Sequence, residues 1–370
     1  MTIKVSTEEF REKLNLANRF LKTNIINTGL QSILFDIEKN KINIYSSNLS
    51  FFFVSEVKLK NTIKEEKTFV FDPKKLVEIL SFVSDEEITF IVKEKKIILK
   101  TKTISTSFPY LHDSKYPKPK NPEKTKTLNL GKLSDALNLV LFSTAADDTK
   151  PTLTGINFLQ KEEGLTLAST DGFRLSVYNL KDTSFDFIKK ESVIIPADFL
   201  KLILKQISKA KQVDIGFVDK ENLFYFSVGK DSFYTRVIEG EFPPFEQVIP
   251  DTYTTKITLD RQEFLKNIRI ASIFAKEFSN ILIFEVKEDE LYIYPRVEED
   301  EKDTLVKQKA KVKGGDIRIA FNYKYVFDFV NNIQSDKVEI EFLREKAPAV
   351  FRSTKNPEYL HIIMPVDIRS

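Results

Sequence analysis

The feature of this sequence that most constrains its fold is a strand–turn–helix pattern that recurs six times. Each copy joins a few β-prone residues to an amphipathic stretch, as in "TIKVSTEEFREKL" and "KITLDRQEFLKNI". Aligned on the first predicted buried helix position, the copies are spaced 66, 60, 64, 64 and 62 residues apart, which indicates an internal repeat. Residues four apart share a helix face, and the paired apolar positions are Phe10 and Leu14, Leu76 and Leu80, Ala136 and Val140, Leu200 and Leu204, Phe264 and Ile268, and Val326 and Val330.

Each predicted helix is followed by runs in which apolar and polar residues alternate. Examples are "SILFDIEKNKINIYSSN" from Ser32 and "VEIEFLREKAPAVFRST" from Val338. A period of two is typical of half-buried antiparallel strands. The repeating unit is therefore one strand, one helix and about three strands.

Two proline-bearing connectors, 107–127 and 241–256, divide the six units into pairs. Proline cannot donate to a strand ladder and disfavours helix before it, so both segments are predicted to be extended. We therefore predict an α+β fold of three similar domains, each a pair of βαβββ units with two helices packed on antiparallel sheets. The expected boundaries are 1–124, 125–252 and 253–370.

Composition restricts the possible functions. The 370 residues include no Cys, which removes disulfides, thiolate catalysis and Cys-based zinc sites. The two histidines, His112 and His361, lie in no cluster of metal-ligand spacing, so we expect neither metal nor cofactor. No apolar run has membrane-spanning length and no signal peptide is apparent, so we expect a cytoplasmic protein. The net charge of +3 is too small to predict nucleic-acid binding by itself.

The segment "ASTDGFRLSVYNL", 168–180, has two interpretations. Asp171 with Arg174 could be a catalytic carboxylate beside a phosphate clamp, in an enzyme acting on a phosphorylated substrate. The sequence supplies no second carboxylate, base or metal ligand for that chemistry. Asp-Gly between two β-like runs is instead typical of a hairpin, because Gly172 tolerates a positive φ. We therefore favour the hairpin.

Four segments carry a family resemblance: "LTGINF" (153–158), "STDGFRL" (169–175), "EFPPFEQVIP" (241–250) and "HIIMPV" (361–366). With the threefold repeat, they make the whole chain similar to the bacterial β-type sliding clamp of the replicative DNA polymerase. The resemblance implies a non-enzymatic homodimer, closed head to tail into a ring. Helices would line the hole, and sheets would continue across domain boundaries. Implied partners are duplex DNA, the replicative polymerase, an ATP-dependent clamp loader and other proteins with a short clamp-binding peptide.

In that family a groove between domains two and three receives peptides of the type Gln-Leu-x-Leu-Phe. Phe173 stands where the family commonly has His, and Asp367 where it commonly has Arg; these two departures leave the fine ligand preference open, but not the site. Carried over position by position, the expected groove residues are Leu153, Thr170, Gly172, Phe173, Arg174, Leu175, Pro243, Gln247, Val248, Asn322, Tyr325, Ile362, Ile363, Met364, Pro365 and Val366.

Basic residues on the predicted helices are candidates for DNA contact, although such stripes equally indicate solvated helix faces. Lysines without base-reading partners predict phosphate contacts only, hence binding without sequence preference. For self-association, Ile273 and Phe274 either pack within domain three or contact domain one of a second chain. A monomeric scaffold with no DNA role is the remaining alternative. The candidate DNA-facing residues are Arg11, Arg19, Lys22, Lys201, Lys205, Lys209, Lys266 and Arg269.

Overall fold

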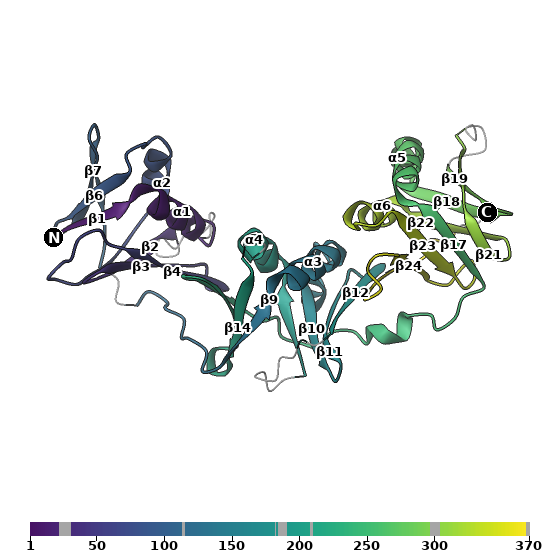
Figure 1. The fold of residues 1–370 in the computed structure, drawn as a ribbon, viewed down its shortest axis with the longest axis horizontal. Coiled ribbons are helices and arrows are strands. Elements are labelled where there is room, and N and C mark those ends of the chain that lie inside the picture. Colours follow the sequence, from purple (N-terminus) through teal and green to yellow (C-terminus); the bar gives the residue numbers. More distant parts are fainter. Residues whose placement is uncertain are drawn as a thin grey trace. The chain divides into compact units, whose positions relative to one another are not determined.

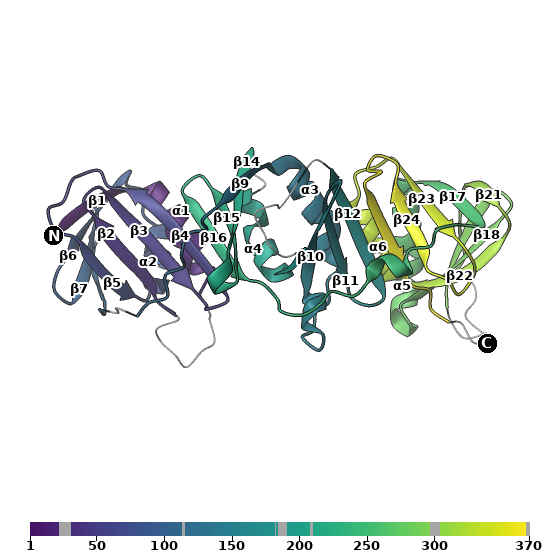
Figure 2. The ribbon, with the colours of Figure 1, turned by 90° about the horizontal axis from the view of Figure 1, so that it is seen from below.

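The computed structural model describes residues 1–21, 31–112, 115–181, 183, 191–207, 210–296 and 304–367. The chain forms two compact units, each assembled from two stretches of sequence. The first unit comprises Met1–Leu130 with Leu202–Val237, and the second comprises Gly131–Lys201 with Ile238–Ser370. Each unit contains one large and one small antiparallel sheet (Figures 1 and 2).

The structure confirms all six predicted strand–helix pairs, and all six anchor positions are fully buried. One helix departs from the predicted stripe: Leu204 is half-buried, whereas Ile203 is fully buried. A 3.6-residue turn places positions three and four on either side of one line, so either can face the core. The pairs are β1(Thr2–Ser6) with α1(Thr7–Asn18), β5(Lys67–Phe71) with α2(Lys74–Ser81), β9(Thr125–Asn129) with α3(Leu130–Val140), β13(Ser192–Pro196) with α4(Ala197–Ile207), β17(Thr255–Asp260) with α5(Arg261–Phe278), and β22(Ile317–Asn322) with α6(Tyr323–Asn332).

In the first unit, α1 packs over β3 and β4 and lies beside α2 (Figure 1). The ring of Phe10 contacts Phe35 and Phe90, with centroids 5.7 and 5.0 Å apart, so one helix residue joins both sheets. The sheets have the orders β1-β6-β7-β8 and β5-β2-β3-β4-β16-β15-β14-β9. Their remaining strands are β2(Ile33–Glu38), β3(Lys41–Ser47), β4(Phe51–Lys58), β6(Glu87–Val92), β7(Lys96–Lys100), β8(Ser105–Pro109), β14(Gln212–Val218), β15(Leu223–Val228) and β16(Asp231–Arg236).

The second unit repeats this packing. Phe264 of α5 contacts Phe284 at 6.2 Å, and Phe329 of α6 contacts Phe351 at 5.5 Å. The sheets have the orders β13-β10-β11-β12-β25-β24-β23-β17-β21 and β20-β19-β18-β22. Three strands follow each helix as predicted, with β21 as an addition. The remaining strands are β10(Gly155–Lys161), β11(Gly164–Thr170), β12(Arg174–Lys181), β18(Ile281–Lys287), β19(Glu290–Pro295), β20(Val306–Lys309), β21(Lys311–Gly314), β23(Lys337–Phe342), β24(Ala349–Ser353) and β25(Tyr359–Ile363).

Both large sheets run across predicted domain boundaries. In the first unit β4 pairs with β16, and in the second β12 pairs with β25, where Figure 2 shows β12 and β24 in one continuous surface. Pairing at these two seams covers strand edges that would otherwise be open to aggregation. The expected continuity of the sheets is therefore confirmed at both seams.

Candidate functional site

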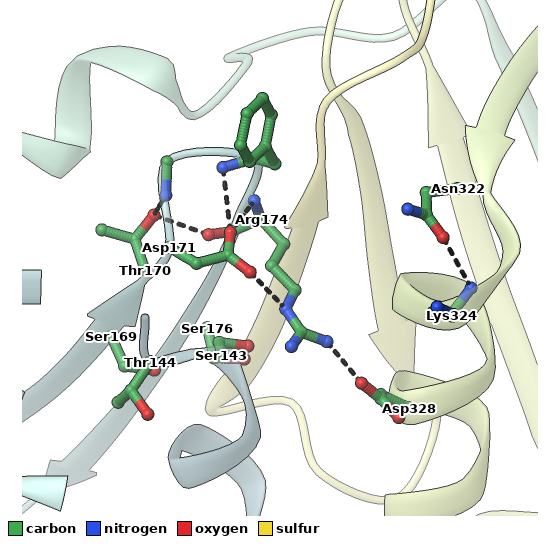
Figure 3. Close-up of polar contacts among 12 residues, drawn as sticks. Ser143, Thr144, Ser169, Thr170, Asp171, Arg174, Ser176, Asn322, Lys324 and Asp328 are labelled. Carbon is green, nitrogen blue, oxygen red and sulfur yellow. Dashed lines mark hydrogen bonds and ion pairs between the residues drawn. The ribbon is translucent and has the colours of Figure 1, made fainter. Parts of the chain in front are cut away.

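The segment Asp171, Gly172 and Phe173 closes a tight hairpin between β11 and β12, which confirms the predicted turn. Asp171 Oδ1 accepts hydrogen bonds from the backbone N–H groups of Phe173 and Arg174, at 2.9 and 3.0 Å (Figure 3). Thr170 Oγ1 accepts from the Gly172 N–H at 3.0 Å. Gly172 has φ +93°, a conformation that a side chain disfavours. The Asp171 carboxylate is therefore occupied in shaping the turn.

Arg174 is held between two carboxylates. Its Nε donates to Asp171 Oδ2 at 2.9 Å, and its Nη1 donates to Asp328 Oδ2 on α6 at 2.6 Å (Figure 3). The guanidinium carbon also lies 4.6 Å from the centroid of the Tyr325 ring. Burial, followed by the Asp171 carboxylate, raises the pKa of Tyr325. Because the charge of Arg174 is already compensated, the geometry does not favour the phosphate-clamp interpretation.

A cavity of about 410 Å³ lies beside this hairpin. Leu175 and Ile362 pair across β12 and β25, and both pack with Phe245 in one buried apolar cluster. Val248 and Met364 are exposed. The cavity therefore combines a buried apolar wall with accessible apolar side chains. Its complete lining is Lys150, Thr152, Leu153, Thr170, Gly172, Arg174, Leu175, Pro243, Pro244, Phe245, Val248, Ile362 and Met364.

Most of the predicted groove residues contribute to this cavity. Four lining residues were missed, namely Lys150, Thr152, Pro244 and Phe245. Pro244 and Phe245 directly follow the predicted residue Pro243 in the Phe-Pro-Pro-Phe connector, so the sequence could have indicated them. Lys150 caps the short helical turn Pro151–Thr154 and Thr152 lies within it, and no sequence pattern marks either residue. The predicted residues that line the cavity are Leu153, Thr170, Gly172, Arg174, Leu175, Pro243, Val248, Ile362 and Met364.

Seven predicted groove residues lie outside the cavity lining. Ile363 is fully buried in the core opposite Arg174, because consecutive strand residues point to opposite faces of a sheet. The Asn322 side chain accepts from the Lys324 N–H at 3.0 Å and so caps α6 (Figure 3). Tyr325 lies against Arg174.

The other four are exposed or half-buried. Phe173 is 62% exposed at the hairpin tip, and its carbonyl accepts from the Met364 N–H at 2.8 Å. Gln247 is exposed on the short helix that also carries Val248. Val366 donates its N–H to the Ala320 carbonyl at 2.8 Å, and Pro365 is half-buried before it.

Three buried polar side chains form a hydrogen-bonded chain close to the hairpin in sequence and pairing. Ser176 Oγ lies 2.8 Å from Ser143 Oγ and 2.8 Å from His361 Nδ1, and all three residues are inaccessible to solvent. The imidazole stacks on Phe329 at 5.3 Å. Burial, with a smaller contribution from the Arg174 charge, lowers the pKa of His361 well below its ordinary value. A neutral His361 therefore links β25 to β12 through Ser176, two residues along β12 from Arg174.

Of the predicted DNA-facing residues, Arg11 lies on α1 with Arg19 at its C-terminal cap, Lys201 and Lys205 lie on α4, and Lys266 and Arg269 lie on α5. Arg11 Nη1 donates to the carbonyls of Leu80 and Val83, both at 3.4 Å, so this side chain faces the end of α2. Arg269 lies over the Phe327 ring at 5.4 Å and remains exposed. Lys22 and Lys209 lie outside the described residues. Of the others, Lys201 pairs with Asp198 at 3.4 Å, and Arg19, Lys205 and Lys266 are exposed.

The predicted self-association residues are not buried within domain three. Ile273 and Phe274 are 59% and 44% exposed on α5, next to the exposed Ile270. Within the described ranges, no three His, Asp or Glu side chains lie near enough to share a metal ion. None of the helices in those ranges is long and apolar enough to cross a membrane.

Comparison with protein families places three successive matches along the chain. Residues 1–119 match the N-terminal domain of the DNA polymerase III beta subunit, 127–244 its central domain, and 246–367 its C-terminal domain. A curated relative is the beta sliding clamp of Staphylococcus aureus, 30% identical over 241 residues that form 65% of this chain and 63% of the relative. That of Staphylococcus epidermidis is 30% identical over 227 residues, 61% of this chain and 59% of the relative. These alignments thus span less than two thirds of the relatives' length.

Solved structures of beta subunits share the fold over the whole chain. The Thermotoga maritima structure superposes with a TM-score of 0.90 at 20% identity. A Pseudomonas aeruginosa structure superposes with a TM-score of 0.92 at 19% identity. In both comparisons the match covers 100% of each chain.

Proposed function

This chain belongs to the bacterial DNA polymerase III beta subunit family, and we propose that it is a DNA sliding clamp, a processivity factor without enzymatic activity of its own. Three domains, 1–124, 125–252 and 253–370, would form half of a ring, and two chains would close head to tail around duplex DNA in the cytoplasm. Tethering the replicative polymerase to such a ring keeps the enzyme's effective concentration at the primer end high.

The observation that carries this proposal is the apolar cavity beside the Asp-Gly hairpin. Its volume of about 410 Å³ falls in the range of ligand-binding pockets. Leu175, Phe245 and Ile362 suit the Leu and Phe anchors of a Gln-Leu-x-Leu-Phe peptide, and Met364 can adapt to several ligands. The polymerase, an ATP-dependent clamp loader and other partners would bind here through such a peptide.

Peptide binding is tested by calorimetry with a synthetic Gln-Leu-x-Leu-Phe pentapeptide. We expect an affinity on the order of micromolar, consistent with a few buried anchors. The double variant Met364→Ala with Arg174→Ala should reduce it beyond detection. Leu305→Ala is the matched control, because Leu305 is exposed but does not line the cavity. Absence of binding, or binding that the double variant leaves unchanged, would remove the site.

DNA contact in this proposal is electrostatic and weak. The exposed cationic side chains of Lys205, Lys266 and Arg269 suit phosphate groups, and such contacts lose strength as salt rises. Retention would then be topological. After loading by the clamp loader and a high-salt wash, the protein should remain on circular duplex and leave linear duplex. Equal retention on both forms would argue against encirclement.

Ring closure is proposed to use the apolar surface of α5. Ile273 and Phe274 are exposed there, and Phe82 at the end of α2 is 81% exposed on predicted domain one. Isolated exposed side chains are common, but a cluster on one helix favours an interface. We assign Ile273 and Phe274 to contact with domain one of the second chain.

A further inference from the structure

The two seams of the large sheets have the same geometry. The same type of hairpin precedes each seam. Between β3 and β4, Asn48 Oδ1 accepts hydrogen bonds from the N–H groups of Ser50 and Phe51, at 3.0 and 2.7 Å. Asp171 accepts the equivalent pair of hydrogen bonds between β11 and β12. Leu49 has φ +74° where Gly172 has φ +93°. The internal repeat therefore provides a residue-by-residue alignment of the β4–β16 seam with the β12–β25 seam.

At the first seam the aligned residues are charged or polar. Lys13 Nζ of α1 lies 2.8 Å from Asp231 Oδ2 of β16, with side chains only 15% and 12% exposed. Ser55 of β4 donates to the other carboxylate oxygen at 2.6 Å. Lys13 and Ser55 belong to predicted domain one and Asp231 to domain two, so this cluster, Lys13–Asp231–Ser55, links the two domains.

At the second seam the aligned residues are apolar or aromatic. Leu139 corresponds to Lys13, Tyr178 to Ser55, and Tyr359 to Asp231, as the helix anchors and the strand registers require. Leu139 and Tyr359 are buried in one core cluster against which Tyr178 packs. The two tyrosine rings lie 6.3 Å apart. These three positions thus use opposite chemistry. Two residues further along the register the contrast is reversed, because Phe53 faces Phe233 at 5.4 Å in the first seam and Ser176 faces His361 in the second.

This difference changes how each seam responds to perturbation. Apolar packing is non-directional and tolerates small shifts, whereas a largely buried ion pair requires both partners, since removal of one leaves an uncompensated charge. Lys13 and Asp231 also border a pocket. A cavity of about 510 Å³ is lined there by Glu8, Glu12 and Lys13 of α1 together with Gly229 and Asp231.

We propose that the Lys13–Asp231–Ser55 cluster is an electrostatic joint that holds predicted domains one and two in register, and that its loss frees domain one at the β4–β16 seam. The β12–β25 seam, where Leu139, Tyr178 and Tyr359 occupy the aligned positions, remains closed. If the chain forms the proposed ring, opening of the ring would be accompanied by movement at the β4–β16 seam, and the peptide cavity would keep its shape. The joint itself does not depend on that function.

Hydrogen exchange of the full-length protein tests the joint. Asp231→Asn preserves the side-chain shape and removes the charge. It should raise exchange of the β4–β16 ladder amides by about tenfold or more, while the β12–β25 amides stay within about twofold. Lys13→Met should act similarly. The double variant should be less perturbed than Asp231→Asn alone, because it leaves no uncompensated charge.

The matched control is Glu87→Gln, which removes a 3.3 Å ion pair to Lys4 that is exposed and lies within domain one. It should leave both ladders unchanged, as expected of a surface pair. Unchanged exchange at β4–β16 in both single variants would overturn the proposal. An equal rise in exchange rate at the two seams would also overturn it, because it would indicate general destabilisation. So would a double variant whose exchange at β4–β16 rises as much as in the two single variants combined.

Discussion

Asp328 on α6 accepts a 2.6 Å hydrogen bond from Nη1 of Arg174, the first residue of β12. A helix of predicted domain three therefore positions a side chain that domain two contributes to the cavity. The guanidinium carbon also lies over the Tyr325 ring, 4.6 Å from its centroid, so the group is contacted by two residues of α6. Such preorganisation lowers the ordering cost of ligand binding.

Removing this contact should weaken peptide binding without unfolding the protein. For Asp328→Asn we expect a threefold to tenfold lower affinity for the pentapeptide, about 1 kcal/mol, because a charge-assisted hydrogen bond becomes a weaker neutral one. Calorimetry measures the change. Asp336→Asn is the control, since that carboxylate pairs with Lys355 at an exposed position. Equal affinities for wild type and Asp328→Asn would contradict the positioning role.

The hairpin should be sensitive to backbone conformation rather than to space. A Cβ at Gly172 would meet no atom within 4 Å, yet the φ of +93° strains any L side chain. Gly172→Ala should therefore destabilise the protein by about 1 kcal/mol in denaturant unfolding. Gly315→Ala offers a matched control, with open space and no such φ. Two variants of equal stability would show that the turn tolerates an L residue.

Protonation of His361 should oppose folding. Burial, with a smaller contribution from Arg174, depresses its folded-state pKa below the ordinary 6.5, so the unfolded chain binds more protons as pH falls below that value. The free energy of unfolding should drop by about 1 kcal/mol between pH 7 and pH 5.5. Urea unfolding at both values measures it. His361→Leu should abolish the decrease, whereas His112→Gln, at an exposed position, should preserve it. If the free energy of unfolding of His361→Leu still decreases between pH 7 and pH 5.5, other titrating groups cause the decrease.

Self-association should depend on the apolar surface of α5. Ile273→Asp places a charge in the proposed interface, and we expect light scattering to shift from about twice 42.9 kDa to the mass of one chain. Leu305→Asp changes a similarly exposed apolar residue elsewhere and should leave the dimer intact. If Ile273→Asp remains dimeric, the interface does not include Ile273.

The sequence by itself determined the repeating unit, because local periodicity reports which face of each element is apolar. The six anchor residues, from Phe10 to Val326, are all fully buried, and three strands follow each helix, with β21 as a fourth after α5. The Asp171–Gly172 turn was equally local, since its hydrogen bonds join residues within four positions. Its role beside a cavity came from family resemblance, not from the turn chemistry.

Only the tertiary structure decided which side chains meet. Phe245 and Lys150 line the cavity because chain segments far apart in sequence converge there, and Ile363 leaves it because strand alternation turns it into the core. The ion pair between Lys13 and Asp231 joins residues 218 positions apart. No periodicity encodes such a pair, because long-range register depends on the pairing of β4 with β16.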